Sequence, residues 1–149
     1  MRINSKPFGI IDVDERQKLK FPHGLLGFED LTEYVLLDAS QPPFYWLQSL
    51  EDQEIAFVLI DPKMFKPDYT PELSEQDLEE IGISDPEDQL VFAIVTIPEK
   101  QELMTANLQG PIVVNKTLKT ARQSISVNPR WMVKHFIIEE LEAVRDTAC

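Results

Sequence analysis

The apolar residues of this chain come in short runs, and most of these runs stop at or near a proline or a glycine. The runs are rich in Val, Ile and aromatic residues and recur at a spacing of roughly 10–15 residues, which is typical of β-proteins. Eleven prolines and five glycines fit such interrupted strands better than a helical bundle. The pattern therefore predicts an all-β sandwich or barrel. The predicted strands cover Phe8–Ile11, Leu19–Phe21, Tyr34–Leu37, Phe44–Leu47, Ile55–Ile60, Leu90–Ile97 and Ile112–Val114.

One segment departs from the strand pattern and predicts a short helix. Ser74 is a suitable N-cap residue, and acidic residues follow it in the first turn, where the helix dipole favours negative charge. Gly82 stands where a helix is expected to end. We therefore expect a helix over about Glu75–Ile81.

The end of the chain has a mixed pattern. Trp131–Ile138 has the character of a strand, whereas Val133, Ile137, Leu141 and Val144 recur at helical spacing. We expect a strand through about Phe136, followed by a short helix or by a frayed tail from about residue 139. No repeat or shift in composition divides the sequence, so we predict a single domain over residues 1–149.

Negative charge is concentrated in the middle of the chain. Residues 51–90 contain thirteen acidic and two basic residues, so this acidic block carries −11 of the chain's net charge of −12. Such a block repels phosphate groups and attracts cationic surfaces. A mildly basic stretch over residues 101–135 lacks interleaved aromatic residues, and we expect it to balance the acidic block within the molecule. We therefore predict a basic protein as partner, with no direct nucleic-acid contact and no membrane contact.

Residue patterns typical of catalysis are sparse. His23 lies in a Pro-His-Gly turn and His135 beside an apolar run, and we expect both to face solvent. No nucleophile elbow, glycine-rich phosphate loop or calcium-loop spacing occurs. We predict a protein that is not an enzyme and that needs no cofactor or metal. Two alternatives stay open: a metal-assisted hydrolase that uses the acidic block, and a generic acidic chaperone or nucleic-acid mimic.

The sequence also predicts a cellular compartment. Met1–Ile10 contains no long apolar stretch, and no apolar run reaches the ~20 residues of a membrane-spanning helix. The single cysteine, Cys149, cannot form an intramolecular disulfide. These features predict a soluble, cytoplasmic protein.

Two segments are more specific than generic strand sequence. The first covers Phe21–Glu29, and the second covers Thr105–Asn115. Shorter motifs lie between them: Trp46–Asp52, Asp61-Pro62 and Pro67–Tyr69. In this order and spacing, from about Ile10 to Gln123, the motifs resemble the FliW family of flagellar assembly factors. Asn128–His135 departs from the family pattern, because family members often have a Tyr-Pro pair in the corresponding stretch and this chain has none.

Most of the motif residues are expected to serve the fold. Gly24 and Gly27 permit backbone turns that other residues resist. Asn107 and Asn115 can bond neighbouring backbone groups at strand ends, and Gly110-Pro111 indicates a bend. The residues that we assign to the scaffold are Phe21, Gly24, Gly27, Phe28, Trp46, Pro62, Asn107, Pro111 and Asn115.

The resemblance implies a partner switch. Proteins of this family bind CsrA, a small dimeric RNA-binding repressor of translation, and alternately bind flagellin. Excess flagellin in the cytoplasm occupies the factor and frees the repressor, which stops flagellin translation, and export of flagellin reverses the exchange. The resemblance therefore implies a chaperone-like role in flagellum biogenesis and in translation regulation, without chemistry.

Contact residues are predicted from charge and local pattern. Strand alternation places Phe44 and Trp46 on one face and Tyr45 on the other, and we expect Phe44 and Tyr45 to be aromatic contacts. The acidic residues expected to face the repressor are Glu51, Asp52, Glu54, Asp68, Glu72, Glu75 and Asp77, with Glu79 and Glu80 as further candidates. Reversal of Glu72, Glu75 and Asp77 to Lys is expected to slow association and to leave the fold intact, because exposed charges stabilise little. We expect an antiparallel, β-barrel-like monomer when no partner is bound.

Overall fold

Strands dominate the structure of this protein. The computed structural model describes residues 1–148, which form ten strands, two α-helices and four short 3-10 helices. The strands are β1 (Arg2–Ser5), β2 (Gly9–Asp12), β3 (Lys18–Lys20), β4 (Glu33–Asp38), β5 (Phe44–Ser49), β6 (Ala56–Ile60), β7 (Gln89–Thr96), β8 (Thr105–Asn115), β9 (Ala121–Gln123) and β10 (His135–Phe136). The helices are α1 (Glu75–Glu80), α2 (Ile137–Ala148), and the 3-10 helices η1 (Glu15–Gln17), η2 (Pro62–Met64), η3 (Pro86–Asp88) and η4 (Gln101–Leu103).

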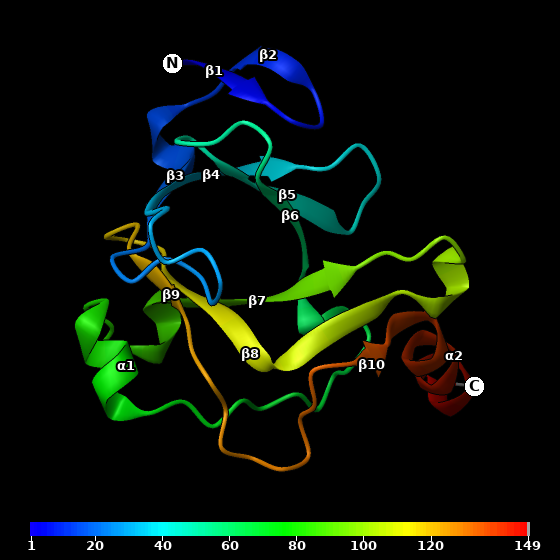
Figure 1. Ribbon diagram of the computed structural model, residues 1–149. Coiled ribbons are helices and arrows are strands. Elements are labelled where there is room, and N and C mark those ends of the chain that lie inside the picture. Colours follow the sequence, from blue (N-terminus) through cyan, green and yellow to red (C-terminus); the bar gives the residue numbers. More distant parts are fainter. Residues whose placement is uncertain (149) are drawn as a thin grey trace.

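Eight of these strands join in one sheet that curls into a nearly closed barrel (Figure 1). Neighbours along the order β10-β8-β7-β6-β5-β4-β3 are antiparallel, and β9 pairs with the second half of β8. At the seam, the backbone N–H of Lys20 donates to the carbonyl of Lys119 over 2.9 Å, and Lys20 bridges to Thr120 just before β9. Closure of this kind leaves few free strand edges. The predicted fold class, an all-β antiparallel barrel-like fold, is confirmed.

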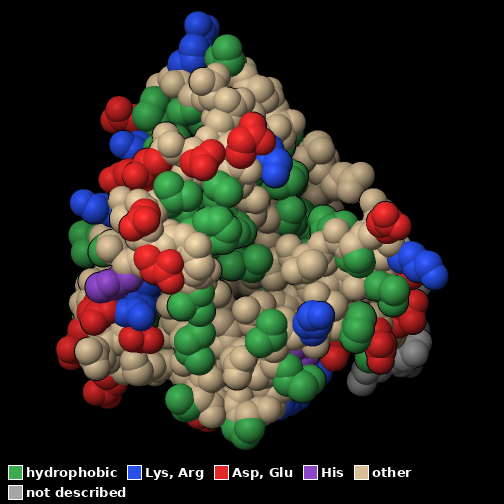
Figure 2. Space-filling model, in the orientation of Figure 1, with side chains coloured by type: hydrophobic (Ala, Val, Ile, Leu, Met, Phe, Trp, Pro, Cys, Tyr) green, Lys and Arg blue, Asp and Glu red, His purple; other side chains and the backbone are tan. Residues whose placement is uncertain are grey.

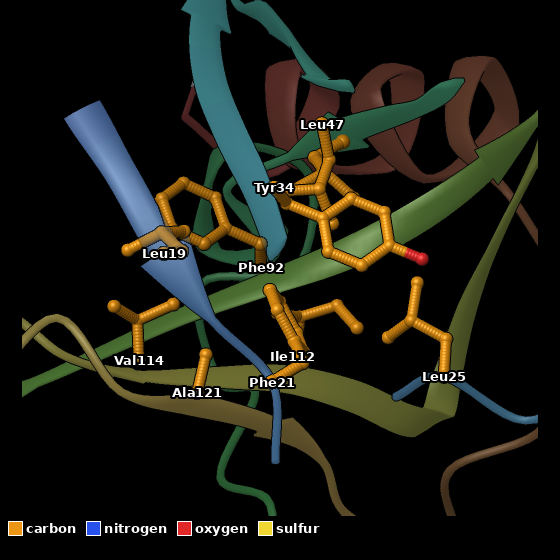
Figure 3. Close-up of a cluster of buried hydrophobic side chains, with 10 residues drawn as sticks. Leu19, Phe21, Leu25, Tyr34, Leu47, Phe92, Ile112, Val114 and Ala121 are labelled. Atoms are coloured by element: carbon orange, nitrogen blue, oxygen red, sulfur yellow. The ribbon is translucent and has the colours of Figure 1, made fainter. Parts of the chain in front are cut away.

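Apolar side chains fill the inside of the barrel, because alternate residues of each strand point inward. The register aligns Leu47 of β5 with Leu36 of β4 and Phe57 of β6, and all three belong to the inner cluster. Figure 3 shows labelled side chains from several strands meeting there, and the rings of Phe21 and Tyr34 meet edge to face at 5.0 Å. Full burial of one such side chain stabilises a fold by ~1.5–3 kcal/mol, so the interior strongly favours closure.

Three parts of the chain cover the outer face of the barrel. The β1–β2 hairpin packs Ile3 in a cluster with Val35 of β4, and α1 packs Leu78 in a cluster with Val113 of β8. A third cluster, around Trp131, joins the start of α2 to the outer faces of β6, β7 and β8. In Figure 1 these three covers lie at the top, the lower left and the right of the barrel. The barrel therefore has one inner core and three outer ones.

The long strand β8 carries the second sequence motif and bends in its middle. In the pairing of β7 with β8, Ala93 alone faces the four residues Leu108–Pro111. Asn107 Oδ1 accepts hydrogen bonds from the backbone N–H groups of Gln109 (3.1 Å) and Gly110 (2.9 Å) within this bulge. A bulge bends its strand, so the two halves of β8 can pair with different neighbours, β10 and β9.

The sequence predicted most of these elements. Every predicted strand overlaps an observed one, and the predicted helix matches α1. Ser74 Oγ accepts a hydrogen bond from the backbone N–H of Asp77 over 3.1 Å, as expected of an N-cap. Gly82 follows the helix with a φ of +77°, a conformation that glycine adopts without strain.

The C-terminal part of the chain adopts the helix, one of the two outcomes that the sequence led us to expect. The predicted strand over Trp131–Phe136 is confined to β10, and Trp131 itself lies in a preceding loop. The helix α2 follows at once and continues through Ala148, so of the two outcomes expected after Phe136, a short helix or a frayed tail from about residue 139, the structure shows the helix. Cys149 lies outside the described residues.

Candidate interaction surfaces

The first motif forms the turn between β3 and β4. Gly24 has a φ of +63°, and a Cβ atom there would lie 2.6 Å from the Cα atom of Glu29, so a larger residue does not fit. Gly27 also has a positive φ, of +89°. The half-buried ring of Phe28 packs edge to face on Phe57, with 5.2 Å between the ring centroids. These motif residues therefore shape the backbone and pack against the core.

Asn115 ties the second motif to α1. Its Oδ1 accepts hydrogen bonds from the backbone N–H groups of Thr117 and Leu118, each over 3.0 Å, and its Nδ2 donates to the carbonyl of Ile81 over 3.0 Å. One side chain thus holds both the β8–β9 turn and the end of α1. Of the other residues assigned to the scaffold, the structure buries Phe21, Pro62 and Pro111 and leaves Trp46 half-buried.

Two acidic residues of α1 face inward, toward the barrel. Arg122 of β9 pairs with both, and its Nη1 lies 3.3 Å from Asp77 Oδ1 and close to Glu80 Oε2. Ser124 Oγ donates to Asp77 Oδ2 over 2.5 Å, and His23 Nε2 lies 3.2 Å from Glu80. The side chains of Arg122 and Asp77 are only 20% and 21% exposed. The expectation that Asp77 is an exposed charge is therefore wrong, because this carboxylate holds α1 on the barrel.

Asp68 and Glu51 are also engaged by their own chain. Although desolvation opposes the ionisation of Asp68, its hydrogen bond and ion pair with Arg130 lower the pKa of this carboxyl. Glu51 Oε1 accepts hydrogen bonds from the backbone N–H groups of Thr32 (2.7 Å) and Glu33 (2.8 Å), which lower its pKa. The basic stretch thus balances part of the acidic block within the molecule, as expected. We call Glu51, Asp68, Asp77 and Glu80 the inner acids.

A second set of carboxylates remains exposed to solvent. Within the part of the chain that the structure describes, these carboxylates make no hydrogen bond and no ion pair. This set, which we call the outer acids, consists of Glu54, Glu72, Glu75, Glu79 and Glu87. Asp52 is exposed as well, but its Oδ1 accepts a hydrogen bond from the backbone N–H of Glu54 over 3.0 Å. Figure 2 shows acidic side chains gathered at the lower left, over α1, whereas the lower middle of the same face is largely neutral or apolar.

Aromatic residues of β5 line two different recesses, as strand alternation predicted. Phe44 and Trp46 line a groove of about 140 Å³ on the outer face of the barrel, which we call the outer groove. Val58, Ile97 and Met104 extend its apolar wall, and none of its lining residues is charged. This neutral, apolar groove fits an apolar ligand segment.

Tyr45 lines a separate recess at one end of the barrel. This recess, which we call the mouth cavity, has a volume of about 660 Å³. The ring of Tyr45 packs edge to face on Phe92, with 5.5 Å between centroids, and forms part of the cavity wall. The other lining residues come from β4, from the first half of β7, from the segment that follows β6 and from η3: Leu36, Asp61, Pro62, Lys63, Tyr69, Thr70, Pro71, Pro86, Gln89, Leu90 and Val91.

His135 is buried, so the expectation that it faces solvent is wrong. Its side chain accepts a hydrogen bond at Nε2 from the backbone N–H of Met132 over 2.9 Å, and burial lowers its pKa, which keeps the ring neutral. The adjacent Trp131 donates from Nε1 to the carbonyl of Thr70 over 3.0 Å and packs edge to face on Tyr69 at 4.7 Å. Sequence reasoning missed this cluster because its partners lie 61 residues apart in the chain.

Two further features of the described residues bear on chemistry and on membranes. Residues 1–148 contain no group of three or more His, Cys, Asp or Glu side chains placed to hold a metal ion. The carboxylate cluster that a metal-assisted hydrolase would use is thus not formed by the described residues. None of the helices over the same residues combines the length and the apolar character that crossing a bilayer requires.

The fold and these surfaces define a class of protein. It is a small antiparallel β-barrel that presents unpaired carboxylates and two apolar recesses. Surfaces of this kind are typical of proteins that bind other proteins.

Comparison with known proteins gives the family. The FliW protein family matches residues 2–137 of this chain. A relative from Treponema denticola, named flagellar assembly factor FliW, is 43% identical over 143 residues, which cover 96% of this chain and 97% of the relative. A relative of the same name from Leptospira biflexa is 45% identical over 142 residues, which cover 94% of this chain and 93% of the relative.

A solved structure agrees with the sequence relatives. The crystal structure of a flagellar assembly factor FliW superposes with a TM-score of 0.86 at 33% identity, and the match covers 92% of this chain and 96% of that one. The chain belongs to the FliW family of flagellar assembly factors. The resemblance seen in the sequence motifs is therefore confirmed.

Proposed function

We propose that this protein is a cytoplasmic, non-enzymatic regulator that binds a CsrA-type repressor and flagellin in alternation. Membership of the FliW family supports the proposal most directly, since its curated relatives are named flagellar assembly factors. Flagellin that occupies the protein frees the repressor, and export of flagellin returns the protein to the repressor. The exchange couples flagellin synthesis to flagellin export through two competing binding equilibria.

The outer acids support the repressor half of the switch. An RNA-binding repressor presents a cationic surface, and five exposed, unpaired carboxylates complement such a surface. Carboxylates docked beside the RNA site would raise the electrostatic cost of bringing in RNA phosphates, without covering that site. The antagonism would then be electrostatic or allosteric. The inner acids contribute less, because arginines or backbone N–H groups already engage them.

The outer groove supports the flagellin half of the switch. Its apolar, uncharged walls fit an apolar segment, and the disordered end of an unassembled flagellin can fold against such a groove as it binds. The groove lies on the outer face of β5 and β6, whereas the mouth cavity opens at one end of the barrel. The protein is expected to be a monomer when neither partner is bound.

Two matched substitutions test the groove. Ile97 lines it and Leu103 does not, yet both side chains are 48% exposed. We expect Ile97→Ser to weaken flagellin binding about fivefold or more and Leu103→Ser to change it less than about twofold, measured by isothermal titration. Equal effects of the two substitutions would contradict this placement of flagellin.

A pull-down separates the switch from the generic acidic chaperone. Lysate at physiological salt is passed over the immobilised protein and over a variant with all five outer acids changed to Gln. We expect one or two dominant partners, the repressor and flagellin, on the unmodified protein and a loss of the repressor on the variant. A large set of weak basic partners that all leave at moderate salt would favour the generic chaperone.

A further inference from the structure

The mouth cavity has no role in the function proposed above. Its volume of about 660 Å³ lies within the range of ~300–1,000 Å³ that is typical of binding sites. Leu36, Tyr45, Leu90 and Phe92 give it apolar walls, and Leu90 is 39% exposed. Apolar surface that an isolated chain leaves open to water commonly marks a site for a partner.

The rim of the mouth cavity is acidic. Asp61 lines the cavity. Asp85 and Glu87 flank Pro86, which also lines it. Asp38 is the last residue of β4, at the same end of the barrel. It pairs in register with Tyr45, which lines the cavity. Lys63 is the one basic residue among those that line the cavity. Asp61 and Lys63 thus balance each other among the lining residues, and three further carboxylates, those of Asp38, Asp85 and Glu87, lie on residues next to lining ones.

Apolar walls inside an acidic rim specify the chemistry of an occupant. Burial of an apolar side chain is favourable because it removes apolar surface from water, so the walls favour an apolar group. The rim favours cations beside that group. A second copy of this chain has a net charge of −12 and would be repelled, as would a phosphate backbone. The occupant that fits both features is a segment of a basic protein, with an apolar side chain between Lys or Arg residues.

We propose that the mouth cavity is an anchor site for the basic partner, into which an apolar side chain of the CsrA-type repressor inserts. This inference rests on the function proposed above, and it divides binding into two tasks. The outer acids speed the encounter, because long-range charge acts on association. The cavity sets the lifetime of the complex, because a buried anchor side chain acts mainly on dissociation.

Two substitutions at one position test the anchor. Thr70 lines the cavity and is exposed, and its hydroxyl donates to the carbonyl of Asp68 over 3.1 Å. Thr70→Trp and Thr70→Ala both remove this hydroxyl, but only the tryptophan fills the cavity. The hydrogen bond from Trp131 to the backbone carbonyl at this position is available in both variants. Surface plasmon resonance with the purified repressor dimer measures association and dissociation separately.

We expect Thr70→Trp to speed dissociation about tenfold and Thr70→Ala to change it less than about twofold. A folded Thr70→Trp variant that dissociates like the unmodified protein would overturn the anchor and leave the partner switch standing. An unmodified protein that does not bind the repressor would overturn both. If circular dichroism shows that Thr70→Trp is unfolded, Leu90→Ser serves instead, with an expected rise in the dissociation rate of about fivefold.

A gain of binding tests the acidic rim. Lys63→Glu replaces the basic side chain that lines the cavity by an acidic one. Because the repressor is cationic, we expect this variant to associate with it about threefold faster at low salt. Lys100→Glu makes the same charge change beside η4, beyond the other end of β7, and is expected to have less effect. Slower association of the Lys63 variant, or equal rates for the two variants, would contradict a role for the rim.

Discussion

The inner and the outer acids come from the same block of sequence but differ in what they contact. The inner acids, Glu51, Asp68, Asp77 and Glu80, are bonded to arginines or to backbone N–H groups of their own chain. The outer acids make no such bonds within residues 1–148. On α1 the two sets alternate, with Glu75 and Glu79 outer and Asp77 and Glu80 inner. One helix therefore both fastens itself to the barrel and presents charge to solvent.

The difference teaches that the charge of a segment is not the charge that a partner meets. Sequence composition counts thirteen acids over residues 51–90. The structure shows that Arg122 and Arg130, far along the chain, form ion pairs with three of them. Stability and binding should therefore respond to different members of the block, and the following predictions test that separation.

The largest effect is expected from Arg122→Ala. Removal of this guanidinium leaves Asp77 and Glu80 without their counter-ion in a partly buried site, and we expect the free energy of unfolding to fall by about 2–3 kcal/mol. Urea denaturation measures the change. Lys116→Ala is the control, because Lys116 is exposed and its side chain makes no ion pair in the described structure. Equal stability of the two variants would show that the inner acids do not hold α1.

The outer acids should act on association and not on the fold. We expect reversal of Glu72, Glu75 and Glu79 to Lys to slow association with the repressor about tenfold at low salt, with little change in melting temperature. This set replaces the one chosen from sequence, because Asp77 is bonded to Arg122. The difference should shrink at high salt, where exposed charges are screened. An association rate that is unchanged at low salt would remove this surface from the interface.

Two substitutions on α1 that each replace a carboxylate by an amide compare the inner and the outer acids directly. Asp77→Asn breaks an ion pair and perturbs the hydrogen bond from Ser124, so we expect a loss of about 1–2 kcal/mol of stability. Glu75→Gln, two residues earlier, should cost less than about 0.5 kcal/mol, because this side chain is exposed. Thermal unfolding of both variants gives the comparison, and a larger loss for Glu75→Gln would reverse our assignment.

The smallest effect is expected on the pH dependence of stability. The pKa of Glu51 is lowered in the folded protein, so the unfolded chain binds a proton on this group more readily. Its contribution is therefore present above the ordinary pKa of 4.5 and is lost as the pH falls through the lower folded value. The stability difference between the unmodified protein and Glu51→Gln should shrink on acidification. A stability difference that does not change as the pH falls would contradict the prediction.

Much of the fold could be predicted from local sequence. Short runs of Val, Ile and aromatic residues marked seven strands, and Ser74 and Gly82 marked the ends of α1. The sequence missed β1 and β9 and the first half of β8, whose residues include Asn107 and Gln109. A strand with polar residues can be held by backbone hydrogen bonds to a neighbouring strand, so composition alone does not reveal it.

The candidate sites were harder to predict, because they depend on contacts across the sequence. Alternation correctly separated Tyr45 from Phe44 and Trp46, since that pattern is local. The pairing of Asp77 with Arg122 and the burial of His135 depend on how distant strands meet. No periodicity in a single sequence encodes such meetings, which is why the inner acids could not be told from the outer ones.

Co-elution from a sizing column with the repressor, with flagellin and with both together is the most direct test of the proposal that this protein works by binding two proteins in turn. We predict one complex with each partner alone and, with both present, loss of the repressor from the complex as flagellin is added. Failure to co-elute with either partner, or a stable complex of all three proteins at every flagellin concentration, would contradict the partner switch.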